Sequence, residues 1–458
     1  MHIGKAIAGN LLAGSLGRII NSLTPLVLVP FMIRSWGLHL YGEWLILTAI
    51  PTYMMLSPDF GLAGAVVNQM AISTMEGKRD EAIRLYRTSW LVLTAMGAIF
   101  ALVGAAAATR VNWKPLGVTL LSNHAVGILS WSLVQIFLGQ QLLLLAGVYR
   151  SARQNPRCGL LSSFGYALNL SVGIAILVLR GDPLAFVTAN VISRSVFLGI
   201  MLVDARGIMP DFTLGLRGVS LHSIRPYIVP GLGHAAMPLI NALQNEGMVL
   251  VLGAILGPTS VAIFQTTRTA LNGAKSLTGL AASAVMLEIP ALVGEGRTST
   301  VRHLLAINTQ VQIAIVLAWS AFLSLLGRQI FHLWLRSNTI YSAPLVLILL
   351  ASLFPLAIAD SFRILLLATN RIHRAVLMLL PAALVSLVVT ALGGYFLNLN
   401  GAALGIFVFE TLSLLVVCTV TAKCTPGLVR ATLTDTFSKH SIASAYNSAL
   451  LAFRWERT

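Results

Sequence analysis

The sequence has few charged side chains and very little acid. Charged residues make up 10% of its 458 residues, against about 25% in ordinary soluble domains. Hydrophobic residues make up 57%, and the mean hydropathy is +0.83. This balance excludes a soluble enzyme and a disordered chain, because both need more polar residues. Since a membrane helix needs about 20 apolar residues, the composition indicates an all-α, polytopic membrane protein.

Motifs for disulfide, metal and nucleotide chemistry are also missing. Cys158, Cys418 and Cys424 form no CxxC pair, and the nine histidines form no HExxH motif, so neither a disulfide framework nor a zinc site is indicated. No Walker A sequence occurs. The stretch 231–236, GLGHAA, fits G-x-G-x-x-A, but a dinucleotide site needs a preceding strand and this stretch opens an apolar helix. We expect no enzyme activity, metal or cofactor, with any energy input from a proton, sodium or substrate gradient or from the membrane potential.

Hydropathy along the chain predicts twelve membrane spans. We expect the first to be a membrane span and not a cleavable signal, because Arg18 lies inside it and no A-x-A site closes it. The spans are expected at 7–33, 41–72, 86–109, 117–146, 158–179, 184–204, 226–254, 260–292, 303–327, 342–368, 375–397 and 401–422. We expect a six-helix lobe at 1–204, a linker at 205–225, a second six-helix lobe at 226–422 and a basic tail at 423–458, with a cavity between the lobes.

The loop charges predict the orientation. Loops after even-numbered spans, together with Arg87 at the start of the third span, carry fourteen Lys and Arg, and loops after odd-numbered spans carry six. Positive residues concentrate in cytoplasmic loops. The even loops and both termini are therefore expected in the cytoplasm.

The two halves also share a pattern. The stretch 36–44, WGLHLYGEW, follows the first span, and 256–264, LGPTSVAIF, follows the seventh at an offset of 220 residues. Asn21 and Asn241 fall in register at the same offset. Six spans per half give both halves one orientation, which predicts parallel repeats about an axis along the membrane normal. The alternative is chance similarity in a chain rich in Gly and Leu.

The eighth span carries the most informative polar residues. Gln265, Arg268, Asn272 and Lys275 recur at intervals of three, four and three, so they share one helical face. A charge at bilayer depth costs at least about 2.5–3.5 kcal/mol, so such a face should line a cavity or a packed interior. Two cations and two amides suit an anionic, hydroxyl-rich ligand.

Other polar residues inside spans join this candidate site. Asn241 and Asn245 share a face of the seventh span, and Arg18 lies in the first. Arg363 is a further candidate for substrate, although Asp360, three residues before it, can simply neutralise it. The acids are candidates for ion coupling, and they are Asp59, Glu246, Asp360 and Glu410. Asp59 can instead cap the helix after Pro58.

Several stretches together resemble the polysaccharide transporter, or O-antigen flippase, branch of the multidrug/oligosaccharidyl-lipid/polysaccharide (MOP) exporter superfamily. They are PFMIRSWGLHLYGEW at 30–44, DFGL at 59–62, ILGPTSVAIF at 255–264 and NGAALG at 400–405. The resemblance implies a flippase that moves an undecaprenyl-diphosphate-linked oligosaccharide across the bacterial inner membrane by alternating access, for synthesis of O-antigen or exopolysaccharide. It further implies that Arg18, Arg268 and Lys275 face the diphosphate.

Two other functions compete with this one. A multidrug or organic-cation antiporter of the same architecture should line its cavity with acids and aromatic rings. A non-transporting scaffold in a glycan synthesis complex should have no cavity. We expect lipid-linked oligosaccharide and membrane lipids as binding partners, with a polysaccharide polymerase and glycosyltransferases as further candidates, no nucleic acid, and a monomer.

Overall fold

The computed structural model describes residues 2–55, 62–216, 218–227, 237–336, 340–369 and 371–438. Within these, side chains 2–16, 18, 19, 53–55, 284 and 287 are not described. Asp59 and the glycine-rich stretch 231–236 lie outside the described residues. The described part of the chain is helical and contains no strand, as the composition predicts.

Ten helices of the described chain are long and apolar enough to cross a membrane. Two of them contain a break. Helix α1 (His2–Met55) is non-helical at Gly37, and α13 (His373–Cys424) is non-helical at Asn398. Each break falls between two of the predicted spans. The short apolar helix α2 (Leu62–Met75) supplies the rest of the second span, so the predicted arrangement of twelve apolar segments is confirmed.

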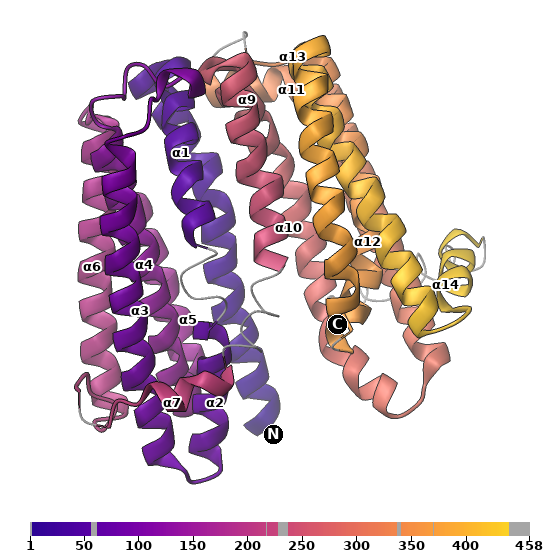
Figure 1. Ribbon diagram of the computed structural model, residues 1–458. Coiled ribbons are helices and arrows are strands. Elements are labelled where there is room, and N and C mark those ends of the chain that lie inside the picture. The colour runs from indigo at the N-terminus through magenta and orange to yellow at the C-terminus, as the bar shows by residue number, and fades with distance from the viewer. Residues whose placement is uncertain are drawn as a thin grey trace, which may run out of the picture. The chain divides into compact units, whose positions relative to one another are not determined.

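The chain divides into two compact units, Met1–Ile263 and Phe264–Thr458. In the first unit the long helices after α2 stand side by side (Figure 1). They are α3 (Arg79–Ala108), α4 (Ala125–Ser151), α5 (Asn155–Val178) and α6 (Pro183–Ile208). Further elements are 3-10 turns at Lys114–Leu116 and Arg225–Tyr227, short α7 (Leu221–Ile224), a π-helix at Leu243–Gly247 and α9 (Met248–Leu256). The lobe boundary predicted at 205–225 stays a prediction.

One core holds α2, α3, α4 and α6 together. Its buried members include Met70, Tyr86, Leu144 and Tyr149. Phe212, from the predicted linker, is also buried in this core. Arg87 of α3 fixes the linker further, because its Nε donates to the carbonyl oxygen of Thr213 at 3.0 Å and its Nη2 to Thr213 Oγ1 at 2.9 Å.

The second unit contains α10, α11 (Thr298–Leu335), α12 (Ala343–Ala368), α13 and α14 (Leu428–Phe437). Helix α10 (Pro258–Gly294) begins just before the division between units. Small residues allow the two halves of α13 to pack closely. A Cβ on Gly405 would overlap Thr390, and one on Gly401 would overlap the backbone of Gly393. The small residues at 401 and 405 therefore serve the close packing of these two helical segments.

One glycine in each of the two repeated stretches has the same backbone conformation. Gly37 has φ 78° and ψ 168°, and Gly257, 220 residues later, has φ 79° and ψ 174°. Side chains strongly disfavour this conformation, so both breaks require glycine. Residues in register also touch, since His39 Nδ1 lies 3.3 Å from Thr259 Oγ1. These findings support the predicted repeat, because contact between equivalent residues is expected near a pseudo-symmetry axis.

Gly42, five residues after the first break, lies close to Pro258, the residue after the second break. A Cβ there would overlap the carbonyl oxygen of Pro258. Because backbone cannot move aside as a flexible side chain can, we expect Gly42→Ala to lower the free energy of unfolding by about 1–3 kcal/mol. Thermal unfolding of the purified protein measures this. Gly199→Ala on α6 is the control, since nothing lies within 4 Å of its Cβ position. Equal melting temperatures for the two variants would show that the packing at Gly42 yields easily.

Candidate functional site: a charged cluster in the second unit

The polar face of α10 contributes a buried guanidinium. Arg268 is only 8% exposed, and Gln265, Asn272 and Lys275 are half-buried. Between them Gly273 lets α10 approach α11, because a Cβ there would overlap the ring of Trp319. The four residues predicted to share a face thus lie on a helix that packs within the unit.

Lys275 meets an acid from a distant part of the chain. Its Nζ lies 3.6 Å from Oε1 of Glu410 on α13, and the Glu410 side chain is 8% exposed. The other carboxylate oxygen, Oε2, is buried and has no hydrogen-bond partner among the described residues. Glu410 can therefore accept a further hydrogen bond or a proton.

A second ion pair lies beside the first. Arg363 Nη1 is 2.5 Å from Oδ1 of Asp360, one turn earlier on α12, and Arg363 Nη2 donates to Ser413 Oγ at 3.0 Å. Ser413 and Glu410 are three residues apart on α13 and so share a face. Helices α10, α12 and α13 therefore converge on one polar region.

We call Arg268, Lys275, Asp360, Arg363 and Glu410 the charged cluster. Lys275 interacts electrostatically with the other four members, and so does Glu410. When all five are ionised, three positive charges face two negative ones. In a region of low dielectric such an excess attracts an anion strongly.

Comparison with known proteins identifies the fold. No family model matches the chain. An Escherichia coli K12 protein named "Putative O-antigen transporter" is 22% identical over 257 residues, which are 56% of this chain and 58% of that protein. The matched stretch thus spans little more than half of that relative.

Solved structures match over nearly the whole chain. A multidrug resistance MATE family transporter of the MOP superfamily, in its inward-facing conformation, has a TM-score of 0.74 at 17% identity, covering 89% of this chain and 96% of its own. The chain has the MOP transporter fold. A MOP superfamily transporter from Pyrococcus furiosus, described as having a binding pocket of reversed polarity that suggests a different function, has a TM-score of 0.62 at 16% identity, covering 93% of this chain and 96% of its own.

Within this MOP fold, the structure brings together only part of the predicted site. Arg268, Lys275, Asp360, Arg363 and Glu410 gather in the second unit, with Gln265 and Asn272 on the same helix as the first two. The expected pairing of Asp360 with Arg363 is confirmed. Arg18 lies in α1, but its side chain is not described. The binding and coupling roles predicted for these residues stay predictions.

The seventh predicted span, 226–254, contains an irregular helical turn. A π-helix at Leu243–Gly247 holds Asn245 and Glu246. The predicted shared face of Asn241 and Asn245 assumes α-helical spacing, and the wider π-helical turn changes that spacing. Both side chains are exposed. π-helical turns are frequent at functional sites in proteins, and this one adds an independent reason to test Glu246.

Sequence reasoning missed two polar partners. Ser413 lies three residues after Glu410, and this spacing could have suggested it. Glu43 has no predicted role beyond its place in the stretch 36–44, yet it is fully buried and accepts four hydrogen bonds from residues 119–121. Its role is structural, because these bonds hold residues 119–121 in place.

Proposed function

We propose that this MOP-fold protein flips a diphosphate-linked lipid oligosaccharide across the bacterial inner membrane by alternating access, for surface polysaccharide synthesis. The charged cluster carries this proposal. A cluster with more cations than acids, placed among membrane-crossing helices, favours a ligand that is itself anionic. A diphosphate carries about two negative charges and cannot cross hydrocarbon unaided.

The chemistry of the cluster suits such a headgroup. A guanidinium group binds phosphate oxygens through two parallel hydrogen bonds. Arg268 and Arg363 supply two guanidinium groups. The amides of Gln265 and Asn272 on α10, and of Asn241 and Asn245 on the seventh span, offer donors and acceptors for sugar hydroxyls. Arg18 is a further candidate cation from the first span.

The likeness to the E. coli protein supports the substrate class, although it covers only part of both chains. A drug or organic-cation antiporter is the second candidate, because one of the solved relatives is a multidrug transporter. Both acids in the cluster lie beside a cation, at 3.6 Å for Glu410 and 2.5 Å for Asp360. That arrangement disfavours a cationic substrate, which would have to displace the resident cations.

We place ion coupling, by protons or sodium, on the acids. Glu410 is the first candidate, since Oε2 is buried without a hydrogen-bond partner among the described residues. Asp360, Glu246 and Asp59 are the others. The partners we propose are the lipid-linked glycan and membrane lipids, with a polymerase and glycosyltransferases in contact with a monomeric transporter.

The proposed orientation predicts which loops face the cytoplasm. One end of the first unit gathers cations with their acceptors: Arg150 Nη1 donates to Asn68 Oδ1 at 2.6 Å, and Arg79 Nη2 lies 2.8 Å from Asp211 Oδ2. We expect reporter fusions at 76–84, at 150–157 and at both termini to report a cytoplasmic location. A periplasmic signal at 150–157 would contradict the twelve-span topology.

Deletion of the gene tests the proposed function in the cell. We expect loss of surface polysaccharide and accumulation of its lipid-linked precursor on the cytoplasmic side, with restoration by the wild-type gene. Susceptibility to organic cations, measured in the same strains, should not change. Normal surface glycan together with increased drug sensitivity would favour the antiporter.

A further inference from the structure

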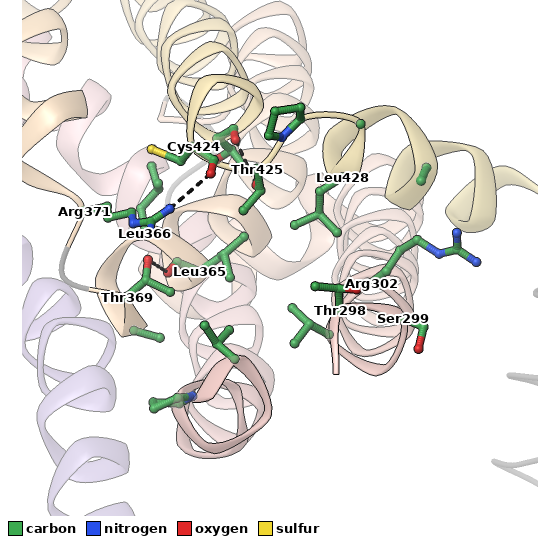
Figure 2. Close-up of a pocket in the computed structure, with 18 residues that line it drawn as sticks. Thr298, Ser299, Arg302, Leu365, Leu366, Thr369, Arg371, Cys424, Thr425 and Leu428 are labelled. Atoms are coloured by element: carbon green, nitrogen blue, oxygen red, sulfur yellow. Dashed lines mark hydrogen bonds between the residues drawn. The ribbon is translucent and has the colours of Figure 1, made fainter. Parts of the chain in front are cut away.

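A cavity lies at one end of the second unit, and no member of the charged cluster lines it. Its volume is about 810 Å³, within the range of small-molecule sites in proteins. The ends of α10, α11, α12 and α13, the residues 425–427 and the start of α14 surround it. Figure 2 shows Arg371 and Thr369 on one side and Ser299 and Arg302 on the other.

Several groups in this cavity favour an anion. Helix α11 begins at Thr298, and its first turn has no acidic residue and no side-chain cap. Because Thr298 and Ser299 line the cavity, the positive end of the helix dipole lies beside it. The hydroxyls of Thr298 and Ser299 line the same wall. Arg371 uses Nη1 to donate to the carbonyl oxygen of Cys424 at 3.1 Å, which leaves its remaining donors for a ligand.

A buried hydroxyl points to a ligand independently. Thr421 lines the cavity, is fully buried, and its Oγ1 has no hydrogen-bond partner among the described residues. Buried polar atoms in proteins almost always have a partner. A ligand oxygen in the cavity would satisfy this one.

The rest of the lining is apolar. Leu365 and Leu428 lie between the two polar sides in Figure 2, and Pro290, Val293 and Ala431 add to that surface. A phosphate with an apolar body therefore fits better than a free ion. In the orientation proposed above, this end of the unit faces the cytoplasm, where anionic lipids and basic residues meet.

Helix α14 closes one side of the cavity and is firmly attached. Arg302 Nε lies 2.7 Å from Asp435 Oδ2, and Gln310 Nε2 donates to the carbonyl oxygen of Thr436 at 2.9 Å. Both bonds join α11 to α14. The cavity is thus built by fixed elements and is not a gap beside a loose helix.

We propose that this cavity binds the phosphate-bearing headgroup of an anionic phospholipid. This site is separate from the charged cluster, and its ligand is a bilayer lipid and not the transported glycan. It gives the second unit a lipid-dependent anchor at the membrane surface.

Thermal unfolding of the purified full chain in a neutral detergent tests the proposal, because a ligand that binds the folded state raises the melting temperature. The probes are dihexanoyl phosphatidylglycerol, dihexanoyl phosphatidylcholine and inorganic phosphate. We expect saturable stabilisation by phosphatidylglycerol, and little by the other two at equal concentration and ionic strength. Equal stabilisation by inorganic phosphate would assign the cavity to a free anion, and equal stabilisation by phosphatidylcholine would remove the charge requirement. Either result overturns the lipid proposal.

Two variants locate the effect. Arg371→Gln should weaken phosphatidylglycerol binding about tenfold or more, as expected for a charged hydrogen bond. Thr421→Val should weaken it about two- to tenfold, while leaving the unliganded protein at least as stable, since an unpaired hydroxyl is replaced by a methyl group. Arg430→Gln on α14 is the matched control, because Arg430 is exposed and lies outside the cavity lining. Wild-type affinity in Arg371→Gln and Thr421→Val, or an equal loss in Arg430→Gln, would overturn the assignment.

Discussion

Glycan export should fall to a few per cent of the wild-type rate in Lys275→Gln. Adding Glu410→Gln should restore the melting temperature but not the export. Lys275 Nζ is 3.6 Å from Glu410 Oε1 inside the second unit. Removing one partner of a fully buried ion pair costs about 3–5 kcal/mol. We expect a smaller cost here, because Lys275 is half-buried and Arg268 and Arg363 also act electrostatically on Glu410. The double variant removes both charges and most of that cost.

The double variant separates binding from folding. If Lys275 contacts the diphosphate, the neutral pair cannot replace its positive charge. A charged hydrogen bond contributes about 1.5–3 kcal/mol, so its loss weakens binding roughly ten- to a hundredfold. Export is measured as surface glycan at matched expression, and folding as the melting temperature. Wild-type export in a well-folded double variant would show that Lys275 and Glu410 are only a structural pair.

Arg268 extends the same test. Arg268→Gln should reduce export tenfold or more, and Arg268→Lys should keep part of it because the charge remains while the paired donors are lost. Arg194→Gln is the matched control for loss of an intramembrane cation. Arg194 lies on α6, outside the charged cluster, and its Nη1 donates to the carbonyl oxygen of Gln135 at 3.0 Å. Equal export defects in Arg194→Gln and Arg268→Gln would point to folding and not to substrate binding.

The second large effect is on stability. Glu43→Gln should lower the free energy of unfolding by about 3 kcal/mol, since its carboxylate accepts charged hydrogen bonds that each contribute about 1.5–3 kcal/mol. Oε2 accepts from the backbone N–H of Leu121 at 2.7 Å, and Oε1 accepts from the backbone N–H groups of Thr119 and Leu120. An amide nitrogen cannot accept these bonds, so at least one donor would stay unpaired.

Thermal unfolding of the purified protein measures this effect. Glu76→Gln is the control, because Glu76 is exposed and pairs only at the surface with Lys78 at 2.8 Å, an arrangement that contributes at most about 1 kcal/mol. A melting temperature for Glu43→Gln equal to that of Glu76→Gln would contradict the role of Glu43 in fixing the loop.

The helices and the polar face of α10 could be predicted from the sequence. Long apolar runs have few alternatives to membrane helices, so the spans could be predicted, and Gly37 and Gly257 could be matched from their shared motif. The three–four–three spacing correctly placed Gln265, Arg268, Asn272 and Lys275 on one helix. Asp360 and Arg363 were predictable as neighbours for the same reason, since i and i+3 meet within a helix.

The partners between helices could not be predicted. Helical spacing relates residues within one helix, whereas the meeting of Lys275 with Glu410 depends on how α10 and α13 pack. The π-helix at Leu243–Gly247 has no clear sequence pattern, because its residues also suit an ordinary α-helix. The cavity beside α14 was equally hidden, since its lining comes from five helices and each helix contributes only a few residues.

Transport in proteoliposomes tests the central claim most directly. The purified protein is reconstituted, and a fluorescent diphosphate-linked isoprenoid oligosaccharide is compared with a fluorescent organic cation, with and without an imposed proton or sodium gradient. The account predicts movement of the anionic glycolipid from one leaflet to the other, no movement of the cation, and loss of glycolipid movement in the Lys275→Gln/Glu410→Gln variant. Movement of the cation by the wild-type protein, with the glycolipid staying in its original leaflet, would contradict it.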